Sequence, residues 1–269
     1  MVFPVSINWH AFLEGDHRSD LELLRFLNRQ AEPFIDVIRF EYCRFDLPDT
    51  LPGRVGSWEI SSPHLGAMVY QPVDHESYLI AGPAFPVSLL YRGIGLKLDE
   101  APSLNLSQSS GKTDAILRLA LTLFRDVTES GNETHRFIRA MTLLEYLANP
   151  DSYKSWTDLK KEIAVHSASS RAQYASILER FQLLTGDKRS GAEKGIRTLL
   201  VHYGKYLEEV ICDPESRRQL FIELQGYASS VINDMFNCQD LSWSDFRDLR
   251  QTKKHNLLNG SGTRDLRQS

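Results

Sequence analysis

The sequence contains little cysteine, no long apolar run and no strong excess of charge. Its 269 residues include three cysteines, Cys43, Cys212 and Cys238, an odd number at wide spacing that indicates neither a disulfide framework nor a zinc knuckle. No apolar run approaches the roughly 20 residues that cross a bilayer, and the first 30 residues carry acidic side chains where a signal peptide would be basic and then apolar. The histidines lack the close partners of a metal site. We therefore expect a cytoplasmic protein that has no membrane contact, no metal and no cofactor.

The net charge of −4 excludes a broadly basic protein that coats nucleic acid without selectivity, but this total is unevenly distributed. Residues 1–110 hold 8 basic and 14 acidic side chains, net −6, whereas residues 111–269 hold 23 and 21, net +2. Within the second part, residues 151–205 hold ten basic and six acidic side chains, net +4. A local basic patch therefore remains compatible with the mildly acidic whole.

Proline is scarce in the second part of the chain, because nine of the eleven prolines lie before residue 110. Proline removes a backbone donor and interrupts helices, so only the second part is suited to long helices. The polar, uncharged segment Pro102–Ser110 is typical of a linker. We predict an α+β domain over residues 1–105, an all-α helical bundle over 106–252 and a mobile tail over 253–269.

The first part alternates apolar and polar residues in several short runs, which predicts a sheet of about five strands. One helix is expected between the first two runs, capped by Ser19 and ending before Glu32-Pro33. The strand candidates are Val2–Trp9, Phe34–Phe45, Val55–Ser61, Leu65–Gln71, Tyr78–Ala81 and Val87–Tyr91. The role of this domain is expected to be that of a sensor or an adaptor.

The second part carries apolar residues at helical spacing, interrupted by caps and glycines. Asp213-Pro214-Glu215, for example, supplies a cap, a first-turn proline and an acidic residue at a helix start. The expected helices are Thr113–Val127, Glu133–Leu147, Trp156–Val165, Ser169–Leu184, Ile196–Ile211, Ser216–Phe236 and Trp243–Leu249.

One local pattern contains residues suited to RNA cleavage, namely Arg197 and His202 in the stretch GIRTLLVHYGKY. Arginine clamps a phosphate through two parallel hydrogen bonds, and histidine transfers a proton near neutral pH. Residues five apart on one helix point about 140° apart, so this pair does not converge on a straight helix. A site shared by two chains would remove the difficulty, and so would a helix that starts between the two residues, as Gly195 allows.

The context of this pair resembles the HEPN superfamily, most closely its Apea-like branch. The resemblance covers roughly residues 111–236. It rests on Leu143-Leu144-Glu145-Tyr146-Leu147, which is similar to the family's "ALE-x-L" helix, and on Arg197, His202 and Gly204 in a later helix. The sequence departs from the family in two places: Thr198 follows the arginine, where members often have Asn, Asp or His, and Tyr203 separates the histidine from the glycine.

The resemblance implies a HEPN-like bundle that forms a homodimer and acts as a metal-independent endoribonuclease. Arg197 and His202 of both chains would meet at the dimer interface and cleave RNA through its 2′-hydroxyl. Proteins of this type are toxins and antiviral defence effectors that cause abortive infection, and an inhibitory or trigger partner would act at the N-terminal domain. The expected RNA contacts are Lys188, Arg189, Lys194, Thr198, Tyr203 and Lys205.

Other interpretations of the same residues remain open. His202 fits a helix histidine with a structural hydrogen bond, the basic segment fits a solvated helix face, and the tyrosines fit packing residues. The main alternative function is a non-catalytic HEPN-like module that dimerises, binds RNA or binds a protein. A third hypothesis, nucleotide binding through Ser110-Gly111-Lys112-Thr113, lacks the glycine that a phosphate-binding loop needs five positions earlier, where Leu106 stands.

Overall fold

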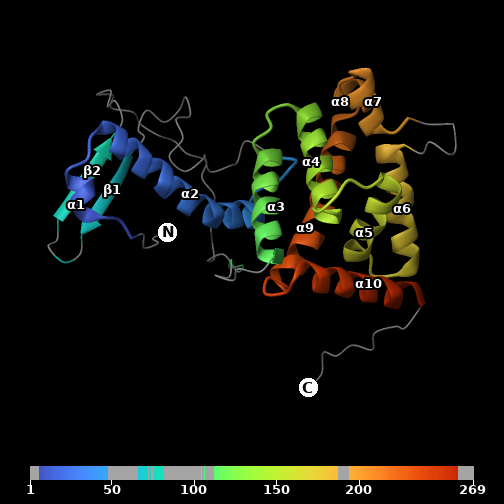
Figure 1. The fold of residues 1–269 in the computed structure, drawn as a ribbon. Coiled ribbons are helices and arrows are strands. Elements are labelled where there is room, and N and C mark those ends of the chain that lie inside the picture. The colour runs from blue at the N-terminus through green and yellow to red at the C-terminus, as the bar shows by residue number, and fades with distance from the viewer. Residues whose placement is uncertain are drawn as a thin grey trace.

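The computed structural model describes residues 6–47, 66–71, 73, 76–81, 104, 106, 112–186 and 194–259. These residues form ten helices and one two-stranded hairpin (Figure 1). The helices are α1 (Trp9–Leu13), α2 (His17–Tyr42), α3 (Lys112–Thr128), α4 (Glu133–Ala148), α5 (Trp156–Ser167), α6 (Arg171–Thr185), α7 (Ile196–Tyr203), α8 (Leu207–Val210), α9 (Pro214–Phe236) and α10 (Trp243–Asn259). The strands are β1 (Gly66–Gln71) and β2 (Glu76–Ala81), which pair antiparallel.

The predicted α+β N-terminal domain is wrong, because the described part of this region is mainly helical. Most of the candidate strand Phe34–Phe45 is helical, because α2 runs through Pro33 and ends only at Tyr42. The candidate strand Val2–Trp9 gives way to helix at Trp9, and its first residues lie outside the described ones. Two other candidates form the β1–β2 hairpin, and Val55–Ser61 and Val87–Tyr91 lie outside the described residues.

Tertiary packing explains why α2 continues past a proline that costs an isolated helix about 3 kcal/mol. Val37 and Phe40, three residues apart, are buried in the same core as the C-terminal helices. The ring of Phe40 lies 5.2 Å from that of Phe124 on α3 and 5.8 Å from that of Phe236 on α9. Burial of this helical stripe offsets the missing backbone hydrogen bond.

The residues after α2 also belong to this core, although the sequence assigns them to a separate domain. Phe45 is fully buried, and its ring lies 4.7 Å from that of Phe124. Gln225 of α9 accepts a hydrogen bond from the Phe45 backbone N–H at 2.8 Å and donates one to the Cys43 carbonyl at 2.9 Å. Further along, the Leu104 backbone N–H donates to Glu41 at 2.6 Å. The C-terminal half of α2 and the bundle therefore share one core, and the N-terminal half of α2 extends away from it (Figure 1).

The helical bundle predicted for the second part is present, with two main differences. The predicted helix Ile196–Ile211 is divided into α7 and α8, because Gly204 adopts a left-handed conformation between them. The predicted tail begins at residue 253, yet α10 continues to Asn259, and residues 260–269 lie outside the described ones. Among the described residues, no helix is both long enough and apolar enough to span a bilayer.

Candidate functional site

Helix α7 carries both residues predicted to be catalytic. It follows Gly195 and ends at Gly204, whose φ of 63° closes the helix with a left-handed residue. Leu200 points into the core, whereas residues 201–206 are exposed. This short helix therefore presents a continuous stretch of side chains to solvent.

Arg197 and His202 lie within the same helix, so the interpretation that a helix starts between them is wrong. Their positions are about 140° apart around the helix axis. The Arg197 side chain is one-third exposed, and its Nη2 lies 3.7 Å from Glu145 Oε2 on α4. His202 lies in the last turn and is exposed. One chain therefore does not bring the two side chains to a common point.

Contacts at the helix start fix where α7 lies. A Cβ added at Gly195 would lie 2.0 Å from the backbone nitrogen of Gly186, so glycine is required for this approach to the end of α6. The Thr198 hydroxyl, predicted to contact RNA, donates to the Thr185 carbonyl at 3.2 Å. Its observed role is to join α7 to α6.

The basic and aromatic residues predicted to bind RNA have different environments. The ammonium of Lys194, two residues before α7, lies 3.9 Å from the centre of the ring of Tyr203, the last residue of α7, and makes a cation–π contact with it. Tyr203 and Tyr206 are 54% and 59% exposed, and Lys205 is exposed between them. These exposed rings are available for stacking, whereas Lys188 and Arg189 lie outside the described residues.

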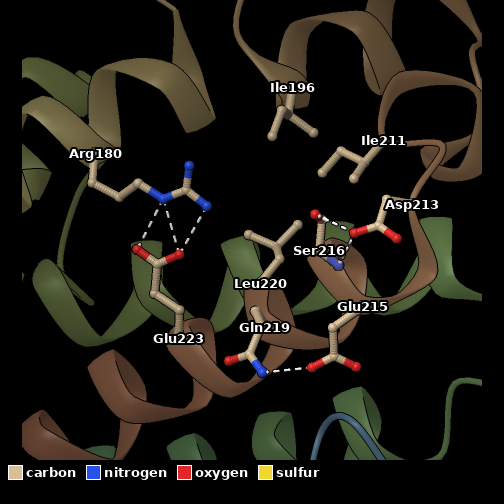
Figure 2. A pocket seen from close by; sticks show the side chains of 9 residues that line it. All are labelled: Arg180, Ile196, Ile211, Asp213, Glu215, Ser216, Gln219, Leu220 and Glu223. Atoms are coloured by element: carbon tan, nitrogen blue, oxygen red, sulfur yellow. Dashed lines mark hydrogen bonds and ion pairs between the residues drawn. The ribbon is translucent and has the colours of Figure 1, made fainter.

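A pocket of about 480 Å³ lies beside α7, between α6 and α9. Figure 2 shows Ile196, Ile211 and Leu220 on its apolar side. Three carboxylates and one guanidinium also line it, from Asp213, Glu215, Glu223 and Arg180. Arg180 is paired with Glu223 through Nε–O distances of 3.0 and 2.9 Å, and Asp213 accepts hydrogen bonds from Ser216 at the start of α9. The excess of carboxylates disfavours a phosphate on this side of α7.

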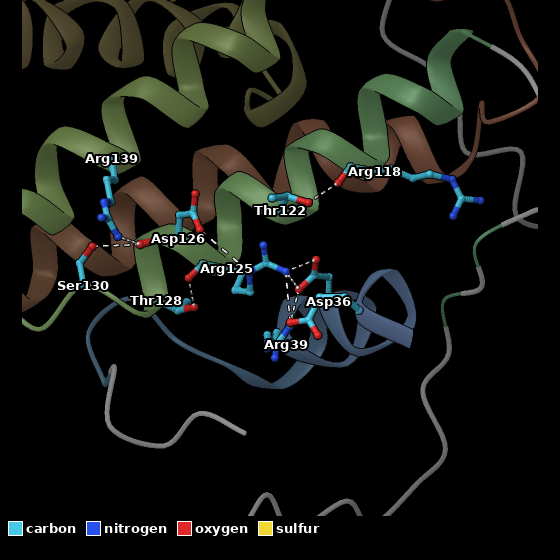
Figure 3. Close-up of polar contacts among 10 residues, drawn as sticks. Asp36, Arg39, Arg118, Thr122, Arg125, Asp126, Thr128, Ser130 and Arg139 are labelled. Carbon is cyan, nitrogen blue, oxygen red and sulfur yellow. Dashed lines mark hydrogen bonds and ion pairs between the residues drawn. The ribbon is translucent and has the colours of Figure 1, made fainter. Parts of the chain in front are cut away.

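Buried charges occur between α2 and α3, where the sequence predicted a strand. Asp36 accepts a hydrogen bond from Arg39 at 2.5 Å and from Arg125 at 3.1 Å (Figure 3). Glu32 also contacts both arginines, at 3.0 and 3.3 Å. Burial raises the pKa of Asp36 to about 6, although both guanidinium groups favour the ionised carboxylate.

A second buried group of charges, which the sequence did not reveal, joins α10 to α5 and α9. Its central residues are His166 and Arg250, whose side chains are 2% and 1% exposed. Arg250 and His255 have the same spacing as Arg197 and His202, but His255 is exposed and lies next to Asn259. The informative signal is the spacing of Trp243, Phe246 and Arg250, which places all three on one face of α10.

The remaining predicted features form no further site. Lys112, in the segment considered for nucleotide binding, pairs with Asp151 at 3.0 Å. In the part of the chain that the structure describes, no group of three or more Cys, His, Asp or Glu side chains could hold a metal ion. The three cysteines are free, and burial raises the pKa of the Cys43 thiol to about 11.

Comparisons with protein-family models, with curated proteins and with solved structures find no match to this chain. The resemblance to HEPN proteins therefore stays a prediction that rests on Glu145, Arg197, His202 and the residues around them.

Proposed function

We propose that the chain is a metal-independent endoribonuclease whose site forms at a dimer interface on α7. The observation that supports this proposal is the placement of Arg197 and His202 on one short helix with an exposed C-terminal half. Because a single chain separates the two side chains, a second copy is needed to place an arginine beside a histidine. Val201 and Tyr203, 44% and 54% exposed, supply apolar surface for that contact.

The proposed chemistry needs only side chains of this helix. His202 of one chain takes the proton from the RNA 2′-hydroxyl, whose oxygen attacks the adjacent phosphorus. The bond to the 5′-oxygen breaks, and the same His202, now protonated, returns the proton to that leaving oxygen. Arg197 holds the phosphate and stabilises the additional negative charge of the transition state. The products are a 2′,3′-cyclic phosphate and a 5′-hydroxyl.

Glu145 leaves part of Arg197 available for this role. The Nη2 to Oε2 distance of 3.7 Å is longer than a hydrogen bond, so Glu145 does not hold the guanidinium as a close bidentate pair does. Such a contact orients the guanidinium at low energetic cost, since a partly exposed ion pair contributes about 1 kcal/mol or less. A phosphate can then bind the remaining N–H groups.

The wider role follows from the resemblance and is part of the same proposal. The protein would act on RNA in the cytoplasm as a toxin or antiviral effector. The acidic first part of the chain would receive the trigger or inhibitor, because its net charge of −6 complements a basic partner.

The test is cleavage of mixed-sequence single-stranded RNA by the full chain in EDTA. Cleavage that yields 2′,3′-cyclic phosphate ends and is lost in Arg197→Ala and His202→Ala is the expected result. His135→Ala is the matched control, because His135 is an exposed histidine on α4. No cleavage by the unmodified protein, or equal cleavage by the two α7 variants, would refute the proposal.

Mixing the two inactive variants tests the shared site directly. If each site combines Arg197 of one chain with His202 of the other, the mixture regains part of the activity that neither variant has alone. Light scattering of differently tagged copies verifies that the two variants exchange chains. A mixture that has exchanged chains and is still inactive would exclude a site shared in this way.

A second candidate function is a non-catalytic module that binds RNA. It is favoured by the exposed rings of Tyr203 and Tyr206 and by the exposed Lys205 between them, which can bind RNA whether or not an arginine meets a histidine. In that case, RNA binding followed by fluorescence anisotropy weakens as salt is raised and survives His202→Ala without any cleavage.

A further inference from the structure

The C-terminal helix α10 is attached to the bundle through a buried histidine whose two ring nitrogens are both engaged. His166 Nδ1 lies 2.6 Å from Asp234 Oδ2 on α9, and Arg250 Nε of α10 donates to His166 Nε2 at 2.8 Å. Because an N–H of Arg250 faces Nε2, that nitrogen carries no proton, and the ring proton resides on Nδ1 and is donated to Asp234. The observed contacts therefore require a neutral imidazole.

Arg250 cannot easily turn away from this histidine. Its Nη1 donates to the Ala148 carbonyl at 2.8 Å and its Nη2 to the Leu147 carbonyl at 3.1 Å, both at the end of α4. Its guanidinium also lies over the rings of Trp243 and Phe246, at 5.5 and 5.1 Å from their centres. These two hydrogen bonds and two ring contacts fix the guanidinium in place, so it remains directed at His166.

The charges around His166 come from three elements. Asp234 of α9 favours the protonated ring, whereas Arg250 and Lys253 of α10 oppose it, and Lys253 itself lies 2.6 Å from Asp234. Glu162 of α5 lies 3.7 Å from Arg250, with Lys254 at 3.9 Å from the same carboxylate. Arg247 adds a further positive charge near Arg250. The nearest group to Nε2 is thus a cation with a donor directed at it.

We propose that the His166–Arg250 contact is a proton-sensitive latch, which holds α10 on the bundle near neutral pH and releases it when His166 takes up a second proton. That proton comes from solvent and binds Nε2. The hydrogen bond from Arg250 is then lost, and two like charges lie within hydrogen-bond distance. This inference does not depend on the ribonuclease activity, because α10 carries none of the α7 residues.

The direction of the pH effect follows from the environment of the ring. Burial, followed by the charge of Arg250, lowers the pKa of His166 below its usual 6.5, although the hydrogen bond to Asp234 opposes the decrease. The folded protein therefore binds this proton less readily than the released or unfolded state. The stability that the latch contributes is fully present above pH 6.5 and is lost as the pH falls toward the lower pKa of the docked state.

Hydrogen exchange of the full chain, followed by mass spectrometry, measures the release. Exchange times are adjusted for the intrinsic pH dependence, and peptides of α10 are compared with peptides of α6 as an internal reference. We expect the protection of α10, relative to α6, to fall by up to tenfold for each pH unit below 6.5. Protection of α10 that stays constant between pH 7.5 and 5.5 would overturn the proposal.

Three variants separate His166 from the other titrating groups. His166→Gln removes the titrating ring, so the relative protection of α10 no longer changes with pH, even if it is lower throughout. His135→Gln, an exposed histidine elsewhere, leaves the pH dependence unchanged. Asp234→Asn keeps an acceptor for the Nδ1 proton but removes the charge that favours the protonated ring, so the pKa of His166 in the docked state falls further. Protection of α10 then continues to decrease below the pH at which that of the unmodified protein levels off, and the total decrease is larger. If His166→Gln does not fold, Asp234→Asn decides the question: a total decrease equal to or smaller than that of the unmodified protein would refute the latch.

Discussion

Replacing Arg250 by alanine removes the donor through which α10 contacts both α4 and α5. The side chain is 1% exposed and donates to three acceptors, the carbonyls of Leu147 and Ala148 and the ring of His166. A buried acceptor left without a donor costs about 1–3 kcal/mol. Three such acceptors, partly rehydrated by water in the vacated space, correspond to a loss of about 3–5 kcal/mol, the range typical of a broken buried charge network.

Urea unfolding followed by far-UV circular dichroism at pH 7.5 measures this loss. Arg247→Ala is the matched control, because Arg247 is exposed and lies one turn earlier on the same helix. We expect Arg247→Ala to change the free energy of unfolding by less than about 0.5 kcal/mol. A loss below about 1 kcal/mol for Arg250→Ala, or equal losses for the two variants, would show that Arg250 does not anchor α10 in the way described.

Three further substitutions test separate parts of the structure, each by urea unfolding. Because burial raises the pKa of Asp36 to about 6, the folded state takes up this proton first as the pH falls. The stabilising contribution of Asp36 therefore grows from pH 6 to pH 4. The difference in free energy of unfolding between the unmodified protein and Asp36→Asn should be larger at pH 4 than at pH 7, by up to about 3 kcal/mol. An equal difference at both pH values would contradict this. Gly204→Ala places a side chain at φ 63° with open space around it, so backbone strain alone should cost about 1 kcal/mol, and no change would argue against the left-handed end of α7. Asn132→Ala removes the cap at the start of α4 and should cost about 1 kcal/mol, whereas Asn132→Asp keeps the cap; equal losses in both would exclude the capping role.

The helices of the second part could be predicted because each has its own amphipathic stripe and a local start or stop signal. Asp213 accepts the expected capping hydrogen bond, Asn132 accepts a capping hydrogen bond of the same kind at the start of α4, and Gly186 ends α6 with a φ of 82°. These signals are local, since a cap involves residues three apart in the sequence. Local signals do not depend on the rest of the fold and are therefore readable from sequence.

The N-terminal region could not be predicted in the same way, because its helix is stabilised by distant residues. Ile38, Phe40 and Tyr42 alternate with polar residues as a strand would, yet Val37 and Phe40 lie three apart, as on one face of a helix. Contacts with Phe124, Arg125 and Phe236, about 90 to 200 residues away, determine that this segment is a helix rather than a strand. A proline at position 33 predicts the end of the helix only when these contacts are ignored.

For the candidate site, too, some features follow from neighbouring residues in the sequence and others depend on distant residues. Arg197 and His202 are noticeable from their spacing, but the partners that decide their environment come from other helices. Glu145 lies about 50 residues before Arg197, and the approach of Gly195 to Gly186 depends on how α6 and α7 meet. The sequence therefore predicts which residues could act, whereas their orientation depends on packing among α4, α6 and α7.

The position of Arg197 and His202 on opposite sides of one helix has a consequence for enzyme kinetics. If cleavage requires the arginine of one chain and the histidine of another, the single chain is inactive and only the dimer cleaves RNA. The cleavage rate per chain then rises in proportion to protein concentration below the dissociation constant of the dimer and becomes constant above it. Val201→Asp, which introduces a charge into the exposed apolar surface of α7, should move this transition to higher concentration while leaving Arg197 and His202 in place. RNA cleavage measured over a wide range of protein concentrations, with molar mass determined by light scattering, checks this prediction. A rate per chain that is constant at concentrations where the protein is monomeric would mean that one chain suffices, and α7 would then not be the site of cleavage.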